Sequence, residues 1–111
     1  MAESPVRRRV RATGRVQGVF FRDTTRRTAG SRGVYGWVRN NPDGSVEAVF
    51  EGSEEAVDAM VRFAREGPRG AMVEHVEVRD EEPEGLTAFR VTYPDNRGPG
   101  LVVRLRVGVL L

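Results

Sequence analysis

Two glycines four residues apart, Gly14 and Gly18, lie between a segment that alternates like a β-strand and a segment with helical spacing. The sequence from 14 to 22 reads GRVQGVFFR, so a run of backbone N–H groups ends on Arg22 near the expected start of the helix. Successive N–H groups in such a turn can form a concave nest for an anion, and a helix start adds unpaired donors and a positive dipole end. The planar guanidinium of Arg22 fits a phosphoryl group with two hydrogen bonds. The segment therefore predicts a loop that binds phosphate without a metal ion.

Hydrophobic periodicity divides the rest of the chain into short strands and two helices. Phe21, Thr25 and Ala29 recur at four-residue spacing, which indicates one helix face packed closely on a sheet. The sequence NPDG at 41–44 is a strong turn signal between two alternating segments and predicts a hairpin. Strands are expected at 6–13, 34–40, 45–51, 72–79 and 88–93. One helix is expected at 21–32. A second helix is expected to begin after Ser53, a candidate N-cap residue, and to end at Gly67.

The order of these elements, β-α-β-β-α-β with a fifth strand, predicts an α+β protein of the ferredoxin-like, split β-α-β sandwich class. Two helices are expected on one face of an antiparallel sheet of four to five strands. We expect a flexible N-terminus at 1–5, one domain at 6–93 and a C-terminal extension at 94–111. The arginines at 7–9 are expected to form a solvated strand end.

Composition excludes several classes of site. The chain of 111 residues has no cysteine and one histidine, so a thiolate metal site, a disulfide framework, a histidine metal cluster and a Ser-His triad are not expected. All 18 cationic side chains are arginine, but the net charge is only +2, which gives little support for nucleic acid binding. The N-terminus lacks the apolar run of a signal peptide and no segment is long enough to span a membrane, so a cytoplasmic protein is expected.

The segment GRVQGVFFR resembles the signature loop of the acylphosphatase family. A second segment, with Gly36, Trp37, Val38, Arg39 and Asn40 followed by further glycines, resembles the other signature of that family. The two motifs occur in the family's order and at similar spacing, and the resemblance covers roughly residues 6–93. It implies the same ferredoxin-like fold and hydrolysis of a carboxyl–phosphate mixed anhydride to a carboxylate and inorganic phosphate.

The resemblance also implies which residues form the site. Arg22 is expected to hold the phosphoryl oxygens and Asn40 to orient the attacking water. The phosphate-binding loop is expected to comprise Arg15, Val16, Gln17, Gly18, Val19 and Phe20. Of these, the Gln17 side chain is more suited to bracing the loop, and Arg15 to solvent exposure. No cofactor or metal is implied, and the expected partner is a small acyl phosphate, with no nucleic acid and no membrane.

Two other functions remain open from the sequence. The domain could be a non-catalytic ferredoxin-like module that binds anions, because related domains occur within larger maturation proteins according to the resemblance. An RNA-binding sheet would need exposed aromatic residues on its middle strands, and the strand at 6–13 has none. The presence of both Arg22 and Asn40 favours the enzyme.

The C-terminal extension is not covered by the family resemblance. Between 101 and 111, Val103, Leu105, Val107 and Val109 alternate with Arg104, Arg106 and Gly108. This period of two predicts an added strand. We expect the protein to be a monomer. Because an apolar strand at a sheet edge promotes association, the extension is the surface through which two chains could associate.

Overall fold

The computed structural model describes residues 4–93, so the strand predicted in the C-terminal extension and most of the expected flexible N-terminus lie outside the described residues. In the described part of the chain, no helix is long and apolar enough to cross a membrane. The elements are β1 (Val6–Arg15), α1 (Phe21–Ser31), β2 (Tyr35–Asn40), β3 (Val46–Gly52), α2 (Glu54–Glu66), β4 (Met72–Glu81) and β5 (Phe89–Val91). All seven were expected from the sequence, with ends that differ by up to two residues.

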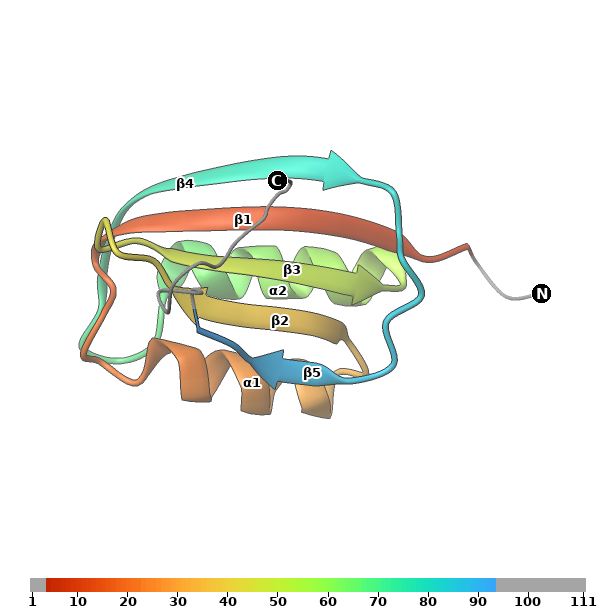
Figure 1. Ribbon diagram of the computed structural model, residues 1–111, viewed down its shortest axis with the longest axis horizontal. Helices are drawn as coiled ribbons and strands as arrows, with labels where there is room; N and C mark the ends of the chain where they lie inside the picture. The colour runs from red at the N-terminus through yellow and green to blue at the C-terminus, as the bar shows by residue number, and fades with distance from the viewer. Residues whose placement is uncertain (1–3, 94–111) are drawn as a thin grey trace, which may run out of the picture.

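The five strands form one sheet in the order β4-β1-β3-β2-β5 (Figure 1). The antiparallel arrangement predicted from the sequence is confirmed for β4, β1, β3 and β2. It is wrong for β5, which pairs parallel to β2. The chain leaves β4 at one edge of the sheet and crosses to the opposite edge, and β5 there runs in the same direction as β2 (Figure 1). The sheet is therefore mixed.

β1 extends two residues beyond its predicted end because it continues to pair with β4 past an irregularity between Thr13 and Gly14. Gly14 has φ +119, and a Cβ atom at this position would lie 2.3 Å from the carbonyl oxygen of Met72. Only glycine fits such a close approach of two backbones at a positive φ. The first glycine of the motif therefore lets β1 turn out of the sheet into the loop.

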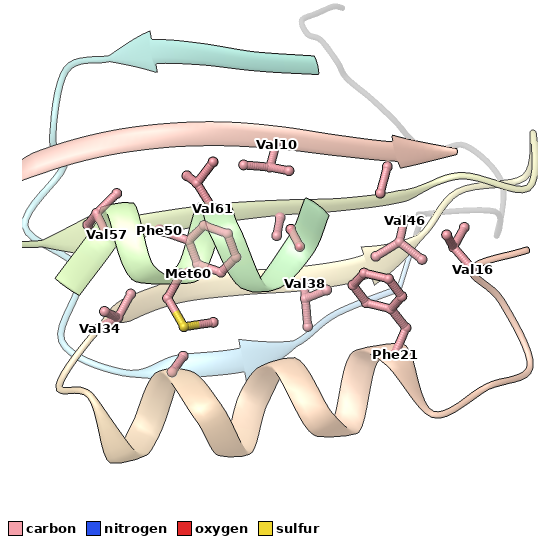
Figure 2. Close-up of a cluster of buried hydrophobic side chains, with 14 residues drawn as sticks. Val10, Val16, Phe21, Val34, Val38, Val46, Phe50, Val57, Met60 and Val61 are labelled. Atoms are coloured by element: carbon pink, nitrogen blue, oxygen red, sulfur yellow. The ribbon is translucent and has the colours of Figure 1, made fainter. Parts of the chain in front are cut away.

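One hydrophobic core lies between the helices and one face of the sheet (Figure 2). The buried helix residues include Phe21 on α1 and Met60 on α2, and they join a single cluster with inward residues of the strands such as Val10, Val38 and Phe50. This places both helices on the same face, as the sequence predicted. α2 begins as expected, because the Ser53 side chain accepts a hydrogen bond from the N–H of Ala56 at 3.2 Å.

The opposite face of the sheet carries paired charges. Arg7 and Arg9 on β1 both contact the Glu81 carboxylate on β4, at 2.9 and 2.6 Å. Arg9 also pairs with Glu47 on β3 at 2.6 Å, and its guanidinium lies 5.3 Å from the centre of the Trp37 ring. The expectation of a solvated strand end at 7–9 is wrong, since the side chain of Arg7 is only 4% exposed. Neighbouring strands supply carboxylates that the local sequence does not reveal.

Candidate functional site

The loop between β1 and α1 is held at both ends by buried apolar side chains. Val16 is fully buried and Phe21 is 4% exposed, and both point into the core from either side of the loop (Figure 2). Between them the backbone takes left-handed conformations at Gly18, with φ +76, and at Phe20, with φ +58. The loop is therefore anchored in the core while its middle curls outward.

The N–H groups of this loop have no hydrogen-bond acceptor in the part of the chain that the structure describes. Among residues 4–93, the N–H groups of residues 17 to 22 donate no hydrogen bond, and the first bond of α1 runs from Thr24 N–H to the carbonyl of Phe20 at 3.0 Å. Phe20 occupies the N-cap position without a capping side chain. Consecutive unpaired donors beside the positive end of a helix are a binding site for an anion.

Arg22 and Asn40, which are 18 residues apart in the sequence, line the same cavity of about 490 Å³. Its lining consists of Val16, Gly18, Phe20, Phe21, Arg22, Asp23, Asn40, Val91 and Tyr93. The loop and α1 supply one part of the wall, and the end of β2 with the β5 segment supplies the other. The two residues selected as catalytic from the sequence thus face one space.

The Arg22 guanidinium is available to an anionic ligand. Within the described residues it has no carboxylate partner, whereas the neighbouring Asp23 carboxylate pairs with Arg26 at 3.0 Å and Arg27 at 3.2 Å. The central carbon of the Arg22 guanidinium lies 5.3 Å from the centre of the Tyr93 ring. This cation–π contact restricts the arginine without neutralising its charge.

The two adjacent asparagines have different surroundings. Asn40 lines the cavity, and its Oδ1 atom is buried with no hydrogen-bond donor among the described residues. The Asn41 amide instead donates to Ser45 Oγ and Glu47 Oε1, both at 3.1 Å. A buried carbonyl oxygen without a donor is rare unless a water or ligand supplies one. Among the described residues, Asn40 therefore lines the cavity with an unpaired side-chain oxygen, whereas the Asn41 amide is already engaged.

The six residues predicted to form the phosphate-binding loop differ in their surroundings. The Gln17 side chain donates to the backbone carbonyls of Asn41 and Ser45 at 2.8 and 2.9 Å, so it braces the loop against the β2–β3 turn, as expected. Arg15 is exposed and does not line the cavity. Val19 lines a neighbouring cavity rather than this one. The loop residues that do border it are Val16, Gly18 and Phe20.

The β2–β3 turn beside Asn40 is stabilised by ionised carboxylates. The hydroxyl and N–H of Ser45 donate to Asp43, and these bonds together with Arg11 lower the pKa of the Asp43 carboxyl. Burial raises the pKa of Glu47, but hydrogen bonds from Asn41, Arg9 and Arg39 bring it below its ordinary value. Both carboxylates stay charged near neutral pH and hold the turn that follows Asn40.

The site predicted from the sequence lacks four of the lining residues, Phe21, Asp23, Val91 and Tyr93. Val91 and Tyr93 belong to the final alternating segment, which carries no motif, and they reach the cavity because β5 crosses to the edge beside β2. Among the described residues, no three metal-ligating side chains gather as a potential metal site.

The fold defines the protein as a ferredoxin-like α+β domain, with a glycine-containing loop between its first strand and first helix. Comparison with known proteins identifies the family, because the sequence model of the acylphosphatase family matches residues 8–91. The chain belongs to the acylphosphatase family.

Individual relatives agree with this assignment. An acylphosphatase of Rubrobacter xylanophilus is 60% identical over 84 residues, covering 76% of each chain. An acylphosphatase of Thermococcus kodakarensis is 56% identical over 86 residues, which cover 78% of this chain and 94% of the relative. The crystal structure of acylphosphatase from Bacillus subtilis superposes with a TM-score of 0.76 at 35% identity, covering 79% of this chain and 99% of that one.

Proposed function

We propose that this protein is an acylphosphatase, which hydrolyses a carboxyl–phosphate mixed anhydride to a carboxylate and inorganic phosphate. The observation that carries the proposal is that Arg22, Asn40 and the loop border one cavity. Among the described residues, the Arg22 guanidinium has no carboxylate partner, the loop N–H groups have no acceptor and the Asn40 Oδ1 atom has no donor. Membership of the acylphosphatase family supports the same reaction.

In this mechanism the loop and Arg22 bind the phosphoryl oxygens. The N–H groups of residues 17 to 22 donate to the oxygens, and the guanidinium adds two charge-assisted hydrogen bonds. Donors already fixed in position stabilise the charge that builds up on these oxygens in the transition state. Because Val16 and Phe21 anchor the loop in the core, little reorganisation is required when the substrate binds.

Asn40 positions the nucleophile. Its Oδ1 atom accepts a hydrogen bond from a water, which aligns one water lone pair with the phosphorus opposite the leaving carboxylate. The water oxygen forms a bond to phosphorus as the bond between phosphorus and the acyl oxygen breaks, and the electron pair leaves with the carboxylate. A phosphoryl oxygen takes the proton released by the water. A carboxylate is a good leaving group, so the reaction proceeds without a strong general acid.

The test is the release of inorganic phosphate from benzoyl phosphate by the purified chain, with a phosphate monoester as the control substrate. We expect turnover of benzoyl phosphate only, at an unchanged rate after dialysis against EDTA, since Arg22 and the N–H groups supply the positive charge. Binding of inorganic phosphate without turnover would instead identify a non-catalytic anion-binding module. Hydrolysis that needs added magnesium would contradict the mechanism.

The active unit is proposed to be the monomer. The described residues of a single chain include Arg22, Asn40 and the loop N–H groups, which are the groups that the proposed reaction uses. Light scattering after size-exclusion chromatography, combined with the phosphate-release assay on each fraction, tests this.

A further inference from the structure

Phe20 has an unfavourable local environment in three respects. Among residues 4–93 it is the one non-glycine residue with a positive φ, and an aromatic side chain at φ +58 is strained. It stands at the N-cap of α1, where a polar side chain would satisfy a free N–H and a phenyl ring cannot. Its side chain is also 81% exposed to solvent. A glycine or asparagine would fit this position better, so packing within the fold does not explain the ring.

The position of the ring suggests its role. Phe20 lines the cavity that holds Arg22 and Asn40, and it also lines a neighbouring cavity of about 620 Å³ whose wall includes Val19, Phe63 and Pro68. The ring therefore stands at the border between the proposed phosphate site and a second surface that combines these apolar residues with Asp23, Thr24, Arg27 and Arg69. Exposed aromatic groups at the rim of a cavity are typical of ligand contacts.

The chemistry of the substrate brings its acyl group to this border. In a mixed anhydride a single oxygen joins the phosphorus to the acyl carbon, so a phosphoryl group held by Arg22 places the acyl group at the rim of its cavity. Apolar area removed from water there adds binding energy in proportion to its size. A phenyl ring on the substrate can also stack on that of Phe20.

We propose that Phe20 determines specificity for the acyl group and favours acyl phosphates with an aromatic or bulky apolar acyl group over those with a small one. This inference rests on the proposed acylphosphatase activity and extends it to a substrate class. Phe20 makes the discriminating contact through its ring, while its backbone forms part of the anion-binding loop.

The test is the ratio of kcat/KM for benzoyl phosphate to kcat/KM for acetyl phosphate in the wild type and in Phe20→Gly, Phe20→Ser and Phe20→Tyr. Effects of a substitution on the loop backbone act on both substrates alike, so the ratio isolates the contribution of the ring. We expect the ratio to fall roughly 5- to 20-fold in Phe20→Gly and Phe20→Ser, a range typical of one apolar contact in a pocket. Phe20→Tyr retains an aromatic ring, so its ratio of kcat/KM values should stay close to that of the wild type.

A stability measurement separates this role from a structural one. Glycine adopts a positive φ without strain, so Phe20→Gly should melt at or above the wild-type temperature while its substrate ratio falls. A wild-type ratio in both Phe20→Gly and Phe20→Ser would overturn the inference while leaving the proposed function intact. Failure of the wild-type protein to hydrolyse either substrate would overturn the proposed function itself.

Discussion

Arg7 and Glu51 form an ion pair of 2.6 Å in which both side chains are only 4% exposed. The same Glu51 carboxylate accepts hydrogen bonds from the N–H groups of Glu84, Gly85 and Leu86, at 2.9 to 3.1 Å. One buried carboxylate thus joins β1, β3 and the segment that leads from β4 to β5. Since the β5 segment supplies Val91 and Tyr93 to the cavity, this ion pair supports one wall of the site from the opposite face of the sheet.

Glu51→Gln should strongly destabilise the protein. The substitution leaves the buried Arg7 charge without this partner and turns an amide donor toward backbone N–H groups that need an acceptor. Breaking a buried pair costs up to about 3–5 kcal/mol when the remaining charge has no other partner. Arg7 still contacts Glu81 at 2.9 Å, so the loss should be smaller than this but still a large part of the total stability of a typical domain. Urea denaturation measures the loss. The control is Glu82→Gln, an exposed position where the change should be small, and equal stability of the two variants would contradict the prediction.

Stability should fall in acid, partly through Glu81. Hydrogen bonds from Arg9 and Arg7 lower the pKa of this carboxyl from 4.5 to about 2 in the folded protein. Between these pH values the unfolded chain binds a proton that the folded protein does not, so the stabilisation is complete above pH 4.5 and is lost as the pH falls toward 2. In urea denaturation at several pH values, the difference between wild type and Glu81→Gln should therefore shrink with acidification. A constant difference would show that the pKa is not lowered.

Arg22→Ala and Arg22→Lys should both lose most of the activity. Lysine retains the charge but cannot bind two phosphoryl oxygens with a planar fork. Removing a donor that stabilises transition-state charge typically lowers the rate about 10²- to 10³-fold. The matched control is Arg26→Lys on the same helix, whose guanidinium pairs with Asp23, and its kcat/KM should stay near that of the wild type. Near-normal turnover by Arg22→Lys would exclude bidentate binding.

Substitution of the two adjacent asparagines should separate catalysis from stability. Asn40→Ala should lower kcat about 100-fold, because a misplaced water attacks poorly, while competitive inhibition by inorganic phosphate changes little. Asn41→Ala removes the hydrogen bonds to Ser45 and Glu47, so it should lower the melting temperature more than the rate. The reverse pattern would assign the water-positioning role to Asn41.

The parts of this protein that could be predicted from sequence are those whose causes are local. The glycine-bounded loop and the periodicity of α1 are sufficient to define the strand-loop-helix unit, and the family resemblance selects Arg22 and Asn40. The parallel pairing of β5 depends on where a long crossover ends, which no short pattern encodes. The burial of Arg7 was missed for the same reason, because its partners are 44 and 74 residues away.

The contact between Arg22 and Tyr93 leads to a final prediction. Tyr93 is 71% exposed, so its ring contributes little to the core, yet it lies against the guanidinium of Arg22, which we propose binds the substrate. A cation–π contact at an exposed site is worth about 0.5–1 kcal/mol, so Tyr93→Ala should weaken inhibition by inorganic phosphate roughly 2- to 5-fold. Tyr93→Phe keeps the ring and should bind phosphate as the wild type does. Tyr35→Ala, at another exposed aromatic residue outside the cavity, is the control. If Tyr93→Ala binds phosphate with wild-type affinity, the ring does not position Arg22, and the hydrogen bonds of the loop alone orient the phosphoryl group.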